Sequence, residues 1–168
     1  MNPISIRYSL YLLAFTAAWI LMEHFAGFNS TNLAVGEYTH NVAMILFWIL
    51  IFFVVAAQRK QNEGALTFQQ GFVTAFQFVL IYSIGFTLLI AFYSHFVNPG
   101  YYEAYKTFTL DKLNAQNATQ KTIDAAMQEV DRIYNGSAIS YFMMFSFSIM
   151  FGVALSVIAA LAFIRKRA

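Results

Sequence analysis

The feature that most constrains the fold is a long stretch without charge. No Asp, Glu, Lys or Arg lies between Glu63 and Glu103, and most residues of this stretch are apolar. An uncharged apolar run of about 18 residues or more is typical of a transmembrane helix. Thr67 and Gln70 form a capping-box pattern, which predicts where the helix begins. The stretch therefore predicts a membrane span over residues 67–97, ended by the Asn-Pro-Gly sequence that follows.

The composition excludes an ordinary water-soluble domain. Of the 168 residues, 60% are hydrophobic and 11% are charged, whereas a soluble domain carries about 25% charged residues. The chain contains no cysteine, which excludes disulfides, thiolate nucleophiles and cysteine metal sites.

The expected fold class is all-α, a polytopic membrane protein with one four-helix domain over residues 1–168. A polar segment at 27–39 is expected to be a turn between the first two spans, and the apolar runs elsewhere predict the other spans. The four predicted transmembrane helices cover residues 6–25, 40–57, 67–97 and 138–164.

Residues 101–135 form the one segment that resembles a soluble protein, and they are expected to be a helical extramembrane loop. Thr119 can cap a helix whose apolar stripe contains Ile123, Met127 and Val130. This stripe could lie on the membrane surface, fold over the bundle of spans or hold a partner protein. We expect it to cap the bundle.

The distribution of basic residues predicts the topology. Four spans place both termini on one side, and basic residues gather in short segments on that side. The positive-inside rule therefore predicts cytoplasmic N- and C-termini, with the loop 101–135 on the opposite side. The basic residues concerned are Arg7, Arg59, Lys60, Arg165, Lys166 and Arg167.

Two motifs resemble a known family. Residues 64–72 read Gly-Ala-Leu-Thr-Phe-Gln-Gln-Gly-Phe, and residues 96–99 read Phe-Val-Asn-Pro before a charged helical loop. With the last span and its basic tail, this pattern resembles the bacterial membrane family called domain of unknown function 4199. The resemblance implies a four-helix protein of the bacterial inner membrane with no established activity. Together with the topology expected from charge, this places the loop 101–135 in the periplasm.

Five ionisable residues lie near the predicted outer ends of the first three spans. Glu37 and His40 have the i, i+3 spacing that metal sites in helical bundles use. A zinc site or a proton-sensing histidine cluster is one interpretation, and contacts with lipid headgroups and water are the simpler one. We expect the simpler one, with no cofactor. The five are Glu23, His24, Glu37, His40 and His95.

The third predicted span carries a polar stripe. A transport path would use such a stripe, but normally with charged residues or broken helices, which the apolar cores of the spans lack. Hydrogen bonds between helices are the simpler interpretation. The stripe consists of Gln70, Thr74, Gln77, Ser83 and Thr87.

Small residues recur every four positions along the last predicted span. Such a face lets a neighbouring backbone approach closely. We expect intramolecular packing, and a dimer seam is the alternative. The face consists of Ser148, Gly152, Ser156 and Ala160, and its predicted partners are Ala14 and Ala18 on the first span and Gly71 and Ala75 on the third.

The motifs found favour no enzyme. The sequence lacks a glycine-rich phosphate loop, a serine elbow and a His-Glu-x-x-His pattern, and its few basic residues make a nucleic-acid partner unexpected. We expect a non-enzymatic structural or partner-binding subunit in a lipid bilayer, with a membrane-protein partner or as a homo-oligomer. One alternative is a transporter or channel component that uses the polar stripe. Another is an outer-face metal enzyme built on Glu23, His24, His40 and His95.

Overall fold

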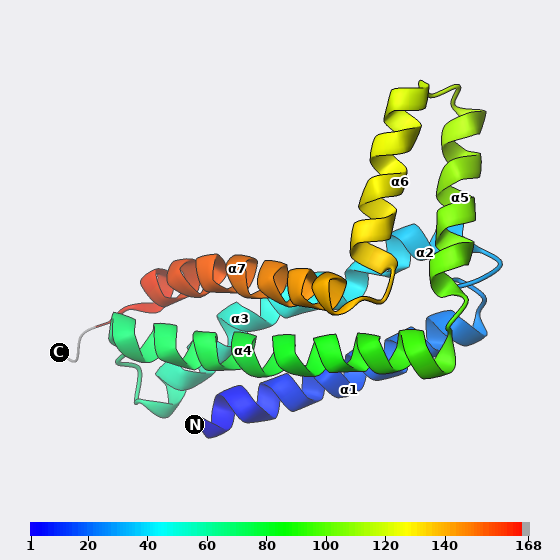
Figure 1. The fold of residues 1–168 in the computed structure, drawn as a ribbon. Helices are drawn as coiled ribbons and strands as arrows, with labels where there is room; N and C mark the ends of the chain where they lie inside the picture. Colours follow the sequence, from blue (N-terminus) through cyan, green and yellow to red (C-terminus); the bar gives the residue numbers. More distant parts are fainter. Residues whose placement is uncertain (166–168) are drawn as a thin grey trace.

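Helix α4 packs against each of the other three long helices of the chain (Figure 1). The computed structural model describes residues 1–165. The long helices are α1 (Pro3–Phe25), α3 (Asn41–Gln61), α4 (Phe68–Phe92) and α7 (Ala138–Phe163). They run alongside one another, and together we call them the helical body. Its centre contains Ile51, Val54, Ala75, Phe78 and Val79, all fully buried.

Shorter helical segments connect these four. They are α2 (Leu33–Thr39), the π-helical turn η1 (Tyr93–Val97), α5 (Tyr101–Ala115) and α6 (Gln120–Tyr134). Within residues 1–165 the chain forms no strand, only an isolated bridge between Leu66 and Arg165. The predicted all-α class is confirmed.

Side-chain caps fix where several helices begin. Asn2 accepts a hydrogen bond from the backbone N of Ile4 at 2.9 Å, at the start of α1. Thr67 and Gln70 exchange the two bonds of a capping box at 3.3 and 3.1 Å. Because these bonds satisfy donors that the first helical turn leaves free, the start of α4 was predictable, and the prediction is confirmed.

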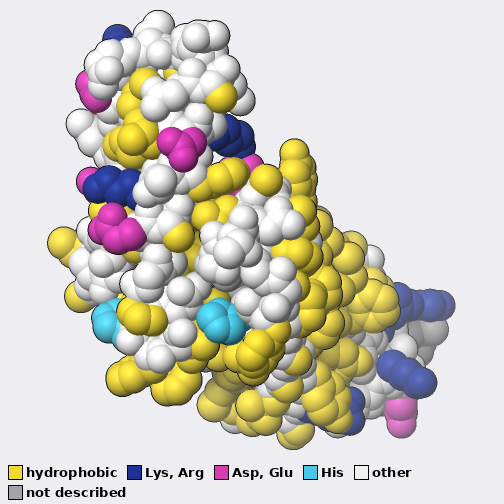
Figure 2. All heavy atoms as spheres, turned by 90° about the vertical axis from the view of Figure 1, so that its right-hand side faces the viewer, with side chains coloured by type: hydrophobic (Ala, Val, Ile, Leu, Met, Phe, Trp, Pro, Cys, Tyr) yellow, Lys and Arg dark blue, Asp and Glu magenta, His cyan; other side chains and the backbone are white. Residues whose placement is uncertain are grey.

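Four helical segments are long and apolar enough to cross a membrane: Pro3–Phe25, Leu33–Gln61, Phe68–Val97 and Ala138–Phe163. Many large apolar side chains on their outer surfaces are exposed, such as Leu88 at 65% and Phe142 at 68%. Figure 2 shows these surfaces covered by hydrophobic side chains, whereas charged side chains gather beyond them. Such a surface fits a lipid environment.

The polar segment after α1 is more ordered than predicted. Residues 27–39 were expected to be a turn, but α2 occupies Leu33–Thr39 and runs into α3 after the single residue His40. Leu33 and Gly36 of α2 are buried. Packing therefore stabilises this short helix, although the polar sequence around it does not predict a helix.

Helices α5 and α6 form a hairpin that stands away from the helical body (Figure 1). The sequence predicted one helix here, beginning after Thr119, and α6 does begin there with Thr119 as its cap. Ile123 and Val130 of its apolar stripe are buried where α6 packs on α5. The stripe therefore does not lie over the bundle along its length, because the hairpin stands away from it, although Ile133 and Tyr134 at the end of α6 meet the helical body.

Charged and aromatic contacts stiffen the hairpin near its base. Tyr102 donates a hydrogen bond to Asp131, and Lys106 Nζ lies 3.2 Å from Asp131 Oδ1. The rings of Tyr105 and Tyr134 lie 4.6 Å apart, between α5 and α6. The hydrogen bonds from Tyr102 and Lys106 hold the pKa of the Asp131 carboxyl below its ordinary value.

The Asp131 contacts predict a pH-dependent hairpin. Because the pKa of Asp131 is lower in the folded hairpin than in an unfolded one, its contribution is present above the unfolded value of 3.8. It is lost as the pH falls through the lower folded value. Below about pH 4, the distribution of distances between spin labels at Thr107 and Gln128 should therefore broaden. Asp131→Asn should remove this pH dependence, whereas Asp111→Asn, outside these contacts, should retain it. An unchanged distribution across this range in the unmodified hairpin would contradict the prediction.

The start of α1 and the end of α7 lie at the end of the helical body opposite the hairpin (Figure 1). At this end the backbones of Leu66 and Arg165 exchange two hydrogen bonds of 2.9 and 3.0 Å. Lys166 and Arg167 of the predicted basic tail lie outside the described residues.

Candidate functional site

A polar network lies at the hairpin end of the helical body, centred on Asn29 and Tyr93. Asn29 is 4% exposed, and its Nδ2 donates to Tyr93 Oη at 2.9 Å. Its Oδ1 lies 2.6 Å from His40 Nε2. Tyr93 Oη also lies 3.1 Å from His24 Nδ1 and accepts from Asn98 Nδ2 at 3.3 Å. The network thus joins α1, the loop after it, the residue before α3 and the turn η1.

Glu23 is a buried carboxylate beside this network. Its side chain is 2% exposed, and its Oε1 accepts from Trp19 Nε1 at 3.1 Å. The other oxygen, Oε2, lies 3.8 Å from His40 Nε2, which is too long for a hydrogen bond. Because His40 Nε2 is much closer to Asn29 Oδ1, the histidine donates its proton there. Within residues 1–165, the Oε2 atom of Glu23 therefore lacks a close hydrogen-bond donor.

The other ionisable candidates make separate contacts. Glu37 Oε2 accepts from Lys112 Nζ of the hairpin at 2.6 Å, and this bond raises the pKa of Lys112. His95 Nδ1 lies 3.0 Å from the backbone O of Ala91 and 3.1 Å from Tyr141 Oη. Among residues 1–165, no three His, Asp or Glu side chains lie close enough together to hold a metal ion. Of the five predicted residues, the structure brings Glu23 and His40 together.

A partly open cavity of about 610 Å³, which we call the chamber, lies in the hairpin half of the helical body, and some of its lining residues, such as Met44 and Phe147, are also exposed on the outer surface. Its lining comes from all four long helices, and the base of the hairpin contributes Tyr101, Ile133 and Tyr134. Most of the lining is aromatic or aliphatic. In the described part of the chain, Glu23 and His40 are its only Asp, Glu, Lys, Arg or His residues. The chamber therefore combines an apolar interior with one buried carboxylate, an arrangement typical of small-molecule sites.

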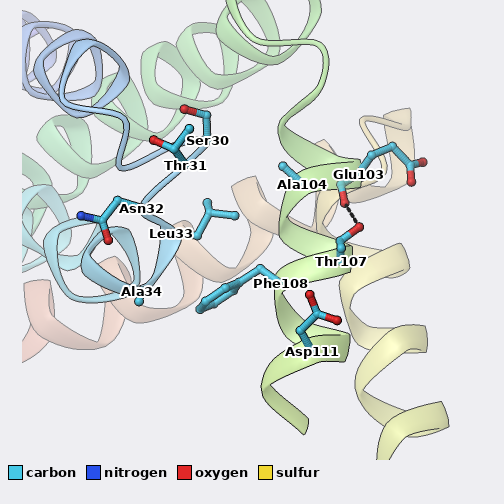
Figure 3. A pocket seen from close by; sticks show the side chains of 10 residues that line it. All are labelled: Ser30, Thr31, Asn32, Leu33, Ala34, Glu103, Ala104, Thr107, Phe108 and Asp111. Atoms are coloured by element: carbon cyan, nitrogen blue, oxygen red, sulfur yellow. Dashed lines mark hydrogen bonds between the residues drawn. The ribbon is translucent and has the colours of Figure 1, made fainter. Parts of the chain in front are cut away.

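A second hollow, of about 540 Å³, lies on the surface between α5 and residues 30–34. Leu33 and Ala34 stand on one wall, and Phe108 and Asp111 on the other (Figure 3). Thr107 donates to the backbone O of Glu103 within its own helix, at 3.0 Å. This hollow is an open groove, and Glu103 and Asp111 stand at its exposed surface.

The polar stripe of α4 is occupied by contacts between helices and within α4. Thr74 Oγ1 donates to the backbone O of Gln70 at 2.8 Å, and Gln77 accepts from the backbone N of Asn2 at 2.7 Å. Ser83 Oγ lies 2.7 Å from Ser148 Oγ on α7, and Thr87 donates to the backbone O of Ser83. Only Gln70 among the five residues is exposed.

The small-residue face of α7 lies against α4. Gly71 approaches Ala160 so closely that a Cβ on Gly71 would lie 3.3 Å from the Cα of Ala160. Gly152 and Ser156 are buried, and a Cβ on Gly152 would overlap the side chain of Val79. Ala14 and Ala18 are exposed, so their predicted role as partners on α1 is wrong.

Helix α1 instead faces α4 with buried hydroxyl groups. Ser5 donates to the backbone O of Thr74 at 2.7 Å, and Ser9 to the backbone O of Phe78 at 3.1 Å. Thr16 Oγ1 lies 3.2 Å from Tyr82 Oη. The Ser5 and Ser9 contacts lie in the half of the helical body away from the hairpin, and Thr16 and Tyr82 line the chamber.

Sequence reasoning missed several residues of the site. Asn29 lies in the segment that is expected to be a turn, Tyr93 and Asn98 lie at the predicted end of the third span, and Tyr101 begins the predicted extramembrane loop. The i, i+4 spacing of Trp19 and Glu23 was the one available signal, since such pairs share a helix face.

A comparison with protein families matches residues 7–166 to the family described as "Protein of unknown function (DUF4199)". No curated protein and no solved structure matches the chain significantly. The family predicted from the two sequence motifs is thus confirmed.

Proposed function

The chain belongs to the DUF4199 family, and from this premise we propose that it is a non-enzymatic membrane protein that acts as a structural or partner-binding subunit. The observation that supports this proposal is the hairpin. Its apolar residues Ile123 and Val130 are buried, and Lys112 in the last turn of α5 bonds Glu37 of α2 at 2.6 Å. A stiff arm of about 22 Å, from helices of 15 residues, thus extends beyond the helical body as a preorganised surface for another protein.

Photo-cross-linking tests this role in native membranes. A photoreactive residue at Leu110, which is 37% exposed on α5, is compared with one at Phe142 on the apolar surface of α7. We expect one membrane protein to cross-link from Leu110 only and to co-purify with the chain in equimolar amount. Cross-linking of a second copy of the chain would identify a homo-oligomer. A chain that purifies alone, with no cross-link from Leu110, would contradict the proposal.

We also propose that the protein lies in the bacterial inner membrane with its termini in the cytoplasm and its hairpin in the periplasm. Arg59, Lys60 and Arg165 lie at the end of the helical body opposite the hairpin, as the positive-inside rule expects. Because the chain has no cysteine, Lys112→Cys introduces a single thiol, and its labelling shows on which side of the membrane the hairpin lies. Labelling of that cysteine from the cytoplasm alone would overturn this topology.

A transporter or channel component is the second candidate, and the chamber favours it. The polar stripe supports it less, because Thr74, Gln77, Ser83 and Thr87 are engaged in hydrogen bonds. Flux of an ion or solute into liposomes that contain the purified protein alone would favour this candidate over the first.

A further inference from the structure

We propose that the chamber is a binding site for a hydrophobic amine, whose ammonium group sits against Glu23. This inference does not depend on the proposed partner-binding role, because Leu110, the hairpin position that tests that role, does not line the chamber. It depends on the charge, the hydrogen bonds and the lining of the chamber.

The first argument is the incomplete bonding of Glu23. Its side chain is 2% exposed and lines the chamber, yet the basic nitrogen next to Oε2 is His40 Nε2, at 3.8 Å. His40 is not free to improve this contact, because its Nε2 lies 2.6 Å from Asn29 Oδ1. No fully buried side-chain oxygen or nitrogen of residues 1–165 lacks a hydrogen bond, so Oε2 is accessible from the chamber that Glu23 lines. A carboxylate in such an apolar site is stabilised by a paired cation that also donates a hydrogen bond. An ammonium group in the chamber supplies both the charge and the donor.

The second argument is the aromatic surroundings of that carboxylate. The indole of Trp19 is fixed beside Glu23 by a hydrogen bond of 3.1 Å to Oε1. Tyr93 and Tyr101 line the same part of the chamber, and the Tyr101 ring lies 6.2 Å from that of His40. The faces of such rings attract ammonium groups. A cation at Glu23 would therefore meet favourable neighbours on more than one side.

The third argument is the apolar remainder of the chamber, which selects an organic cation. Phe47, Phe86, Met144 and Phe147 are among the side chains that line it. A metal ion prefers several oxygen ligands, and the described lining offers one carboxylate. A hydrocarbon body, in contrast, gains by leaving water for such a surface.

The source of the amine is also constrained. Among residues 1–165, no Lys or Arg lines the chamber, so the phosphate of an aminophospholipid would find no charged partner there. The chemistry fits a free amine without phosphate better than the headgroup of a bilayer lipid.

The chain carries its own reporter of occupancy. Its two tryptophans, Trp19 and Trp48, both line the chamber, so a bound molecule should alter their intrinsic fluorescence. The protein in phosphatidylcholine nanodiscs is titrated with phenylbutylamine and with phenylbutanol, which shares the apolar body but carries no charge. We expect saturable binding of the amine, about tenfold tighter or more than of the alcohol.

Glu23→Gln should reduce the preference for the amine to about equal binding of the two compounds, since the amide keeps the shape but not the charge. The matched control is Glu103→Gln, at an exposed residue outside the chamber, which should bind as the unmodified protein does. Ala43 is buried and lines the chamber. Ala43→Phe places a ring in the chamber and should weaken the binding of both compounds. A thermal melt of each variant verifies that it is folded.

Several results would overturn the proposal. They are the absence of a saturable fluorescence change, equal binding of amine and alcohol by the unmodified protein, and an unaltered amine preference in folded Glu23→Gln. Loss of amine binding in nanodiscs that contain phosphatidylethanolamine would show that a lipid headgroup competes for the site, and would overturn the assignment to a free amine.

Discussion

Replacing Gly152 with leucine should lower the free energy of unfolding by about 3 kcal/mol, the largest loss that we expect from a single substitution. Gly152 is buried where α7 crosses α4, and the space next to its Cα is filled by both methyl groups of Val79. A leucine side chain must push the two helices apart, because Val79 itself is fully buried and has no room to turn away. Membrane helices associate through this kind of close packing, so the lost contact is not recovered elsewhere.

Chemical denaturation in mixed micelles measures this effect. The matched control is Ala154→Leu, two positions further along α7 and exposed, which should change the free energy of unfolding by less than about 0.5 kcal/mol. If Gly152→Leu instead unfolds like the unmodified protein, α7 does not pack on α4 through this face. A change in oligomeric state with unaltered stability would indicate that the face forms a seam between copies.

The second large effect is expected at Asn29, where Asn29→Ala should cost about 2 kcal/mol. The side chain of Asn29 donates to Tyr93 Oη, which is buried, and accepts from Nε2 of His40, which is partly buried. Alanine leaves the His40 donor with only the distant Glu23 Oε2 at 3.8 Å. The free energy of unfolding falls because a polar group loses its hydrogen-bond partner in a poorly hydrated site. This cost is larger than the net contribution of one hydrogen bond to stability.

Ser30→Ala is the control for this change, because Ser30 is the next residue of the same loop and is exposed. It should leave the free energy of unfolding within about 0.5 kcal/mol of the original. Equal stabilities of Asn29→Ala and Ser30→Ala would show that water reaches the network and replaces the amide.

The helix starts were predictable because a cap is a local device. Thr67 with Gln70, Thr119 and Ser137 each satisfy backbone donors within three residues of themselves, so the pattern is visible in the sequence. Helix α5 offers no such signal: Gly100 before it makes no side-chain cap, and the helix has no fully buried residue. Its stability comes from α6 and from Glu37 of α2, which lie elsewhere in the chain.

The packing of α1 was mispredicted for a physical reason. The small residues Ala14 and Ala18 resembled a packing face, but α1 turns Ser5, Ser9 and Thr16 towards α4. A hydroxyl group is small enough for close approach, and it also bonds a backbone carbonyl of the neighbouring helix. On a hydropathy scale, serine and threonine count as weakly polar, so the hydropathy pattern of α1 does not reveal which of its faces is buried.

The ionisable residues of the site were predictable from the sequence, but its other residues and their arrangement were not. Glu23 and His40 are conspicuous in the sequence as ionisable groups at span ends. Their geometry depends on Asn29 and Tyr93, which lie on separate segments and meet only after the helices pack. Local sequence patterns carry no information on such contacts between distant segments.

The backbone bridge between Leu66 and Arg165 has a mechanical consequence. It joins the approach to α4 to the end of α7 by two hydrogen bonds of 2.9 and 3.0 Å, beside the tight contact of Gly71 with Ala160. These two helices are thus held close together at the end away from the hairpin. Towards the other end Ser83 and Ser148 join them by a side-chain bond of 2.7 Å. Any separation of α4 from α7 should therefore be larger towards the hairpin, where it would widen the opening that the chamber already has beside α7.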